Sequence, residues 1–167
     1  MAAFTALVDR YRNRLFKFLV TRCNSYADAE DALQDTLINA FRYLHSYDPR
    51  WRFSTWLYRI ALRNAMRQQS RLVTELDEVA DEDRGPLEQC IEASDRENLW
   101  LTARRLLSDE VYTAMWLRYV EDMSVNDVAA VLERSDSWTK VNLMRGRKRL
   151  DAALNSPPSS ETSEAYG

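Results

Sequence analysis

The chain contains very few of the residues that interrupt helices. Its 167 residues include three glycines and four prolines, and no run of alternating Val, Ile and Thr residues marks a β-strand. Apolar residues instead recur at intervals of three and four positions, which is the spacing of one face of an α-helix. We therefore expect an all-α fold.

The net charge of −3 and the isoelectric point of about 5.3 conceal segments of opposite charge. Residues 1–70 carry 11 Lys/Arg against 6 Asp/Glu, a net charge of +5, whereas residues 71–97 carry 3 against 10, a net charge of −7. Nucleic acid responds to the local potential near its phosphates. The acidic average therefore does not exclude a DNA partner.

Several classes of protein are not expected. No apolar run is long enough to span a bilayer, and no secretory signal is visible, so the sequence predicts a cytoplasmic protein without membrane insertion. Cys23 and Cys90 lie in different segments without CxxC spacing, which argues against a disulfide or a zinc site. With His45 as the only histidine and no catalytic cluster, we expect neither an enzyme nor a cofactor.

Composition divides the chain into four parts. We expect helical domains over residues 1–70 and 98–154, joined by an acidic linker over residues 71–97 that contains Gly85-Pro86. The polar tail over residues 155–167, with Pro157-Pro158, is expected to be disordered.

The first domain is expected to start with helices over residues 4–22 and 26–45. In the second of these helices the predicted buried residues are Leu33, Leu37, Ala40, Phe41 and Leu44. The polar residues Asp31, Gln34 and Asp35 fall together on an exposed face. Such a face suits a basic partner surface.

Aromatic and basic residues alternate in a predicted loop over residues 46–53. Tyr47, Trp51 and Phe53 flank Arg50 and Arg52. Aromatic rings can stack on unpaired bases while guanidinium groups bind phosphates. The same rings could equally plug the loop onto the helices, so the sequence leaves both roles open.

The next helix is expected to follow an N-cap at Ser54, with Phe53 and Tyr58 as a hydrophobic staple. Arg59, Arg63 and Arg67 then recur at every fourth position, with no acidic residue at i±4 to neutralise them. Like charges at this spacing repel one another, and a bound polyanion would relieve the repulsion.

The second domain ends in a predicted helix-turn-helix. Ser108 and Ser124 are expected N-caps, a turn is expected at Glu133-Arg134-Ser135, and the last helix should run from Asp136 to Leu154. Its inward face is predicted to contain Thr139, Leu143, Gly146 and Leu150, with Gly146 allowing close backbone approach. Its outward face is predicted to contain Ser137, Trp138, Lys140, Val141, Met144, Arg145 and Lys148.

The run from AEDALQDT through FSTWLYRIALRN closely resembles the second conserved region of bacterial RNA polymerase sigma factors of the extracytoplasmic-function group. The resemblance implies that Asp31, Gln34 and Asp35 bind the clamp helices of the core polymerase. It also implies that the following residues contact the −10 promoter element: Trp51, Arg52, Phe53, Trp56, Arg59, Arg63, Asn64 and Arg67.

The LL-S-D, MSVNDVAAVL and KVNLMRGRKRL runs resemble the fourth sigma region, which reads the −35 element and touches the polymerase flap. The resemblance implies −35 contacts from Ser137, Trp138, Lys140, Val141, Arg145 and Lys148. Two departures are notable. The turn lacks the usual glycine, and Trp138-Thr139 replaces the usual Thr-Val pair, so Trp138 could contact bases or cover a seam between helices. In this family the acidic linker lies along the RNA path, although an inert spacer is equally compatible.

We therefore expect a sigma factor that directs promoter-specific initiation of transcription. The implied partners are core RNA polymerase, double-stranded and melted promoter DNA, and an anti-sigma factor. The alternative is a stand-alone helix-turn-helix repressor whose N-terminal helical domain senses a ligand or dimerises.

Overall fold

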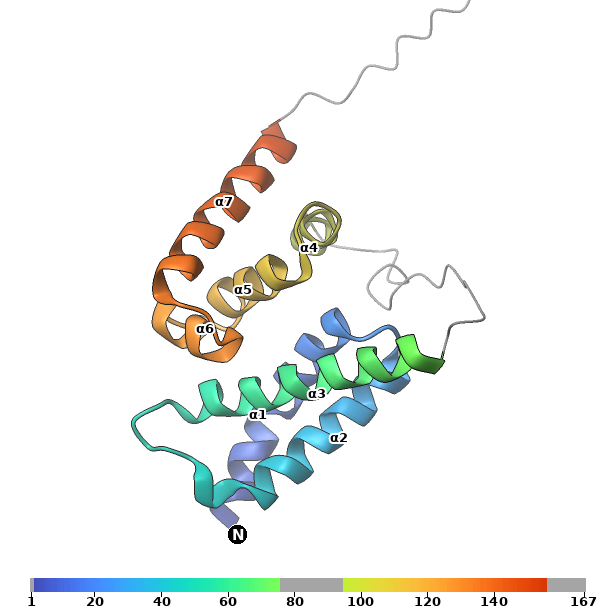
Figure 1. Cartoon of the computed structure of the whole chain (residues 1–167), viewed down its shortest axis with the longest axis vertical. Coiled ribbons are helices and arrows are strands. Elements are labelled where there is room, and N and C mark those ends of the chain that lie inside the picture. Colours follow the sequence, from blue (N-terminus) through green and yellow to red (C-terminus); the bar gives the residue numbers. More distant parts are fainter. Residues whose placement is uncertain (1, 76–94, 156–167) are drawn as a thin grey trace, which may run out of the picture.

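The computed structural model describes residues 2–75 and 95–155, and every regular element within those ranges is a helix (Figure 1). In chain order the elements are α1 (Ala2–Arg22), α2 (Tyr26–Arg42), the short 3₁₀ helix η1 (Leu44–Ser46), α3 (Phe53–Glu75), α4 (Asp95–Leu106), α5 (Asp109–Tyr119), α6 (Val125–Leu132) and α7 (Asp136–Asn155). The predicted all-α fold is confirmed. None of the described helices is long and apolar enough to cross a membrane.

Helices α1, α2 and α3 pack against one another and form what we call the first bundle. Its core consists of side chains from all three helices, and Leu15, Phe18, Leu57 and Tyr58 are completely buried. The Phe18 and Tyr58 rings lie 5.2 Å apart between centroids. Burial of each such side chain stabilises the fold by about 1.5–3 kcal/mol relative to leaving it exposed.

Helices α4 to α7 form the second bundle. Its core contains Tyr112, Leu117 and Val128, all without exposed surface. Trp100 of α4 packs edge-on against Tyr112 and Trp116 of α5, at centroid distances of 5.7 and 5.1 Å. These contacts attach α4 to α5 within the second bundle.

Serine hydroxyls cap the N-termini of α2, α5 and α6, and a fourth serine cap, at Ser135, precedes α7. Ser25, Ser108 and Ser124 each accept a hydrogen bond from the backbone N–H three residues later, as an N-cap does. The caps predicted at Ser108 and Ser124 are therefore confirmed. Each cap fixes the residue at which a helix of the respective bundle begins.

Other sequence-based boundaries differ from the structure. Phe41 and Leu44 are exposed rather than buried, at 50% and 38%, because α2 ends at Arg42 and the chain turns through η1. Helix α3 begins at Phe53, one residue before the predicted cap at Ser54. Helix α3 extends to Glu75 and α4 starts at Asp95, so helices enter both ends of the predicted linker. The rest of that linker, and the tail after Asn155, lie outside the described residues.

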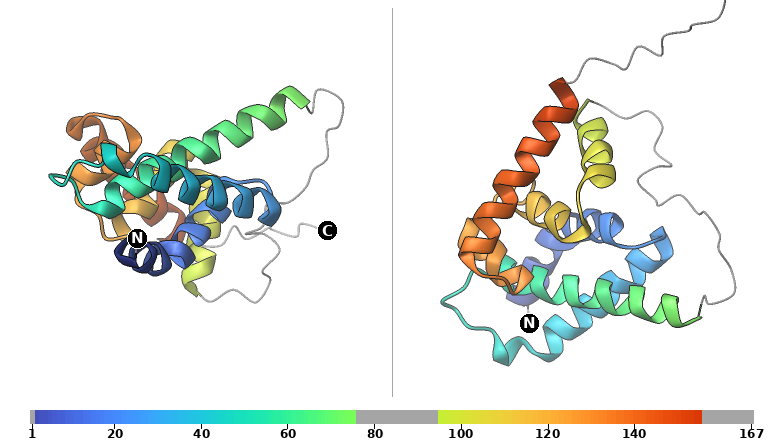
Figure 2. Two further views of the ribbon diagram at one scale, coloured as in Figure 1. Left: turned by 90° about the horizontal axis from the view of Figure 1, so that it is seen from below. Right: turned by 45° about the horizontal axis from the view of Figure 1, so that its top comes forward.

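The two bundles lie against each other, with α6 packed on α3 (Figures 1 and 2). The contact places the turn of the helix-turn-helix beside the first half of α3. A surface of the first bundle that the sequence assigns to DNA therefore faces the second bundle.

Gly146 lets α7 approach α5 closely, as its position on the inward face predicted. A Cβ atom added there would lie 3.2 Å from both Met115 Sδ and Val111 Cγ1. Replacement by a larger side chain would have to displace one of these neighbours.

We predict that Gly146→Val lowers the free energy of unfolding by about 1–3 kcal/mol, because α7 must move away from α5. Urea denaturation followed by circular dichroism measures the change. Gly146→Ala is the control. Its single Cβ meets the tight contacts with Met115 and Val111, while the gain in helix propensity of about 1 kcal/mol offsets their cost, so its midpoint should move less than that of the Val variant. Equal stability of the Val variant and the native chain would contradict close packing at this site.

Candidate nucleic-acid and polymerase interfaces

The acidic face of α2 is exposed to solvent. Asp31, Gln34 and Asp35 are all exposed, while the intervening Ala32, Leu33 and Thr36 are buried against the rest of the first bundle. The helix therefore presents three polar side chains on one side, at the i, i+3 and i+4 spacing that brings them together. This arrangement leaves the carboxylates available to a basic partner.

An apolar patch continues from that acidic face. Ile38, one turn beyond Gln34 and Asp35, is 54% exposed. Phe41 packs edge-on against Phe4 of α1, with ring centroids 5.7 Å apart, and is half exposed. Ile38 was not singled out from the sequence, and Phe41 was predicted to be buried. Both residues lie in the last two turns of α2.

The loop between η1 and α3 is ordered by aromatic contacts. The Tyr47 hydroxyl donates a 2.6 Å hydrogen bond to the Trp51 carbonyl oxygen. Its ring packs against Phe53 and Trp56 at centroid distances of 5.7 and 5.4 Å. Phe53 also contacts Tyr11 of α1, so these rings attach the loop to the bundle. The packing of these rings on the helices is one of the two roles left open by the sequence, and Trp51 at the end of the loop remains 38% exposed.

A cavity of about 380 Å³ lies between this loop, α3 and α6. Trp51 and Trp56 line it on the loop side, Arg59 and Arg63 line it along α3, and Ala130 of α6 closes it from the second bundle. Its walls thus combine indole rings with guanidinium groups.

The arginines of α3 have a carboxylate partner that the sequence analysis missed. Glu133, the first residue of the helix-turn-helix turn, accepts hydrogen bonds through Oε1 from Arg59 Nε and Nη2 at 3.1 and 2.6 Å. The same oxygen accepts a hydrogen bond from Arg63 Nη2. Arg67, one turn further on, is exposed. The predicted repulsion along the arginine stripe is therefore relieved from within the chain.

Glu133 adopts an unusual backbone conformation. It ends α6 with φ 57° and ψ 41°, the left-handed region that normally suits glycine. For a residue with a Cβ atom this conformation costs roughly 1–2 kcal/mol. The sequence signal was available: a glutamate stands in a turn that usually carries glycine.

The hydrogen bonds from Arg59 and then Arg63 lower the pKa of Glu133. A carboxylate with a lowered pKa is charged at neutral pH and contributes its pairing energy there. That contribution is lost as the pH falls through the lowered pKa. At neutral pH, Glu133 therefore stays ionised beside the two arginines.

Two more pairs of charges join the bundles. The Glu121 carboxylate, in the α5–α6 connection, is 2% exposed and accepts hydrogen bonds from Arg14 Nε and Nη2 at 3.0 and 2.6 Å. Arg22 at the end of α1 is buried; its Nη1 lies 3.8 Å from Asp109 Oδ1 and donates to the Asp109 carbonyl oxygen at 3.3 Å. Burial lowers the pKa of the Arg22 guanidinium. In all three places the first bundle supplies the cation.

Asn64 does not face the surface. It is 5% exposed, its Nδ2 donates to Thr36 Oγ1 at 3.2 Å, and its Oδ1 accepts from Asn39 Nδ2 at 3.3 Å. The resemblance placed Asn64 on the −10 DNA; in this structure it joins α2 to α3. We therefore assign it a structural role.

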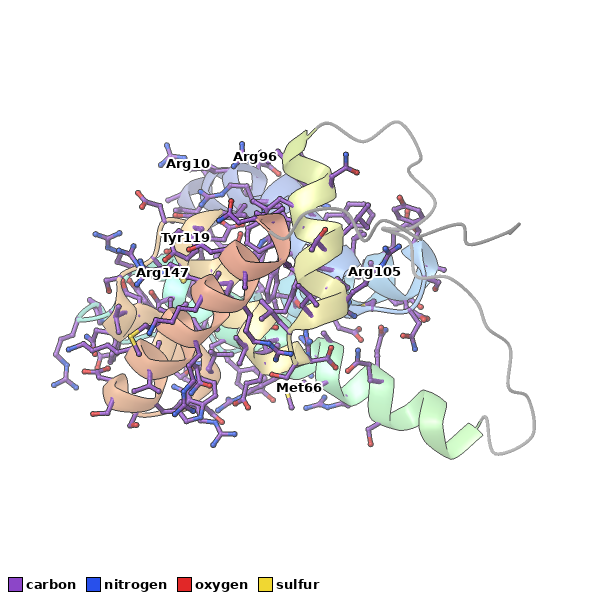
Figure 3. The ribbon with its side chains drawn as sticks, turned by 90° about the horizontal axis from the view of Figure 1, so that it is seen from above. Arg10, Met66, Arg96, Arg105, Tyr119 and Arg147 are labelled. Atoms are coloured by element: carbon purple, nitrogen blue, oxygen red, sulfur yellow. The ribbon has the colours of Figure 1, made fainter. Side chains whose placement is uncertain are left out.

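The last helix has the two faces that its pattern predicted. Thr139, Leu143, Gly146 and Leu150 are buried. The exposed residues are Ser137, Lys140, Val141, Met144, Arg145 and Lys148. Arg147, labelled on α7 in Figure 3, adds to the exposed basic side chains of this helix.

Trp138 occupies an intermediate position at the start of α7. Its backbone N–H donates to Ser135 Oγ at 3.1 Å, which caps the helix. The Arg134 guanidinium lies 4.9 Å from the ring centroid and is bound to Glu110 of α5 at 2.6 Å. The ring is therefore oriented by its neighbours while part of it remains accessible to a ligand.

No cluster of His, Cys, Asp or Glu in the described part of the chain could hold a metal ion. The surfaces described above act through charge, stacking and shape. They define a two-bundle, helix-turn-helix protein whose chemistry suits binding to nucleic acid and to a basic protein surface.

Comparison with known proteins identifies the class. The family model for sigma-70 region 2 matches residues 7–72. The ECF RNA polymerase sigma-E factor of Haemophilus influenzae is 29% identical over 163 residues, which cover 89% of this chain and 86% of that protein. The RNA polymerase sigma-H factor of Pseudomonas aeruginosa is 26% identical over 171 residues, covering 91% and 86%.

Solved structures share the fold. The sigma factor RpoE of Bartonella quintana, in complex with the anti-sigma factor NepR, aligns with a TM-score of 0.74 over 92% of this chain and 98% of that one, at 24% identity. CnrH, in complex with the cytosolic domain of CnrY, aligns with a TM-score of 0.65 over 92% and 88%, at 25% identity. Together, the matched region and the relatives support an extracytoplasmic-function, sigma-70-like factor. This assignment favours a sigma factor over the stand-alone repressor.

We predict that Asn64→Ala lowers the free energy of unfolding by about 1–3 kcal/mol, because Thr36 and Asn39 lose a buried partner. Urea denaturation measures the change. Asn13→Ala, at an exposed position of α1, should stay within about 0.5 kcal/mol of the native chain. If Asn64→Ala left stability unchanged and impaired DNA binding alone, the structural role would be excluded.

Proposed function

We propose that the chain binds core RNA polymerase through α2 and carries two surfaces for promoter DNA, one per bundle. The observation that supports this most directly is the exposed acidic face of α2 beside an aromatic and arginine surface, in a chain that also ends in a helix-turn-helix. The function of a stand-alone repressor does not require the acidic face of α2 or the aromatic and arginine surface. A sigma factor requires all three.

Asp31, Gln34 and Asp35 are the residues we propose for core binding. Carboxylates on a rigid helix can pair with basic clamp helices, and Ile38 adds exposed apolar surface next to them. Charges at the rim of such an interface set the partner and the association rate, while the apolar contact excludes water. We assign the contact with the polymerase flap to the second bundle.

The surface around the 380 Å³ cavity is our candidate for the −10 element. Trp51 and Trp56 offer indole faces to an unstacked base, and Arg52, Arg59, Arg63 and Arg67 offer guanidinium groups to the backbone phosphates. Phe53 contributes by positioning Tyr47 and Trp56, which it contacts. Single-stranded rather than duplex DNA fits such a site, because stacking requires exposed base faces.

The exposed face of α7 is our candidate for the −35 element. A recognition helix enters the major groove with its N-terminal residues at the base edges. Ser137, Trp138, Lys140 and Val141 occupy that end of α7, and Arg145 and Lys148 follow on the same side. The first four are placed to choose the sequence, and the last two to bind phosphates.

Regulation by a protein partner fits the same assignment. One sigma factor of similar fold was solved with the anti-sigma factor NepR, and we propose that an anti-sigma factor also controls this chain. We further propose that the protein acts in the cytoplasm, where core polymerase and promoter DNA are found. It acts by binding and catalyses no reaction of its own.

Run-off transcription with purified core polymerase and a promoter library tests the proposal. The native chain should direct sequence-selective initiation. Asp35→Arg should weaken core binding by about tenfold or more, since an interfacial charge pair typically contributes above 1.4 kcal/mol. Asp9→Arg makes the same change of charge on an exposed position of α1 and should bind normally. Failure of the native chain to initiate would reject the proposed function.

We predict that Trp51→Ala impairs promoter opening more than it impairs binding to duplex promoter DNA, because the ring acts on unpaired bases. Permanganate reactivity of thymines in the polymerase complex measures opening. Met66→Ala is the matched control, because Met66 is 55% exposed on α3 and lies away from the cavity lining (Figure 3). Equal thymine reactivity in the Trp51 variant and the native complex would leave the ring with a structural role only.

A further inference from the structure

Glu133 occupies the position that a DNA phosphate would take on the arginines of α3. One carboxylate oxygen receives three N–H groups, two from Arg59 and one from Arg63. Guanidinium groups that converge in this way bind a carboxylate or a phosphate with the same geometry. The two anions therefore compete for one site.

The second bundle also covers the cavity beside these arginines. Ala130, one turn before Glu133 on α6, forms part of the cavity wall together with Trp51 and Trp56 of the first bundle. Helix α6 packs along α3 at this place. A base that entered this cavity to contact the indole rings would lie beside α6.

Positive and negative charges are divided consistently between the two sides of the interface. The four ion pairs that join the bundles in the described residues take their cations from α1 or α3 and their three carboxylates from the second bundle. The Glu121 side chain is shielded from water at 2% exposure, although its partner Arg14 is 46% exposed, whereas the Glu133 side chain is half exposed. Such an interface can separate at the Glu133 end without unfolding either bundle.

The backbone of Glu133 supports the same conclusion. A left-handed conformation suits glycine at this position of the turn, yet the chain places a glutamate there. The Glu133 backbone N–H caps α6 by donating to the carbonyl oxygens of Ala129 and Ala130. The side-chain carboxylate of Glu133 takes no part in this cap. The side chain instead serves the contact with Arg59 and Arg63.

We propose that Glu133 holds the free protein in a closed arrangement in which Arg59, Arg63 and the adjoining cavity are masked, and that single-stranded promoter DNA must displace it. This inference rests on the −10 role proposed above for Arg59 and Arg63. It assigns the helix-turn-helix turn a second role, as an internal competitor for the DNA site of the other bundle.

The test uses Glu133→Gln in the full chain. Asp122→Asn is the matched control, because Asp122 is the other non-glycine residue with positive φ in the described chain, at 53°, and is exposed on the same bundle. Spin labels at Glu30→Cys on α2 and Asp151→Cys on α7, in a Cys23→Ala/Cys90→Ser background, report the separation of the bundles by double electron–electron resonance. Fluorescence anisotropy with a labelled mixed-sequence single strand of about 12 nucleotides reports binding.

We expect Glu133→Gln to broaden the distance distribution toward longer separations and to tighten binding of the single strand about two- to fivefold, the range of a partly exposed charge pair. Asp122→Asn should change neither. The charge exchange Arg63→Glu/Glu133→Arg should restore the short distance that Arg63→Glu alone loses, while DNA binding stays weak in both.

Two outcomes overturn the inference. An unchanged distance distribution in Glu133→Gln would mean that this residue does not hold the bundles together. A longer distance with unchanged DNA affinity would mean that the closed arrangement masks nothing. Arg63→Ala then separates the two proposals: weaker single-strand binding in that variant preserves the −10 role, and unchanged binding rejects it.

Discussion

The contact between the bundles depends on charge complementarity across an interface that partly excludes water. Arginines on α1 and α3 meet Glu121, Asp109 and Glu133 of the second bundle. The Glu121 pair is the most enclosed, with the carboxylate 2% exposed. A buried charge that lost its partner would be strongly destabilising, so this pair fixes where α5 and α6 lie on the first bundle. The position of the helix-turn-helix relative to α3 follows from it.

In the closed arrangement that we propose, the arginine surface of α3 has two states with different partners. Surfaces that bind phosphate must present uncompensated positive charge, and such charge is unfavourable in a free protein. A carboxylate of the same chain neutralises it until a polyanion is present. The helix-turn-helix turn and the proposed −10 surface are far apart in sequence, but the pairing of Glu133 with Arg59 and Arg63 determines the electrostatics of both.

Much of the fold could be predicted from local pattern. The N-caps at Ser108 and Ser124, the turn at 133–135 and the inward face of α7 all follow from residue type and spacing, and the structure agrees. The exposure of Phe41 and Leu44 could not be predicted, because helical periodicity indicates which face is apolar but not whether another helix covers its end. The burial of Asn64 depends on Thr36 and Asn39 across two helices, which no local pattern encodes. The partner of Arg59 and Arg63 lies some seventy positions away, so the stripe looked unpaired in sequence.

The Glu133 contact has a consequence for ionic strength. Salt weakens the attraction of guanidinium for phosphate, and it also weakens the attraction of guanidinium for the Glu133 carboxylate, which is half exposed. As salt rises, the loss of affinity for DNA is partly offset by easier release of the competing carboxylate. Under the proposed closed arrangement, occupancy of the arginine surface by DNA is therefore less sensitive to changes in cellular salt than it would be on the same surface alone.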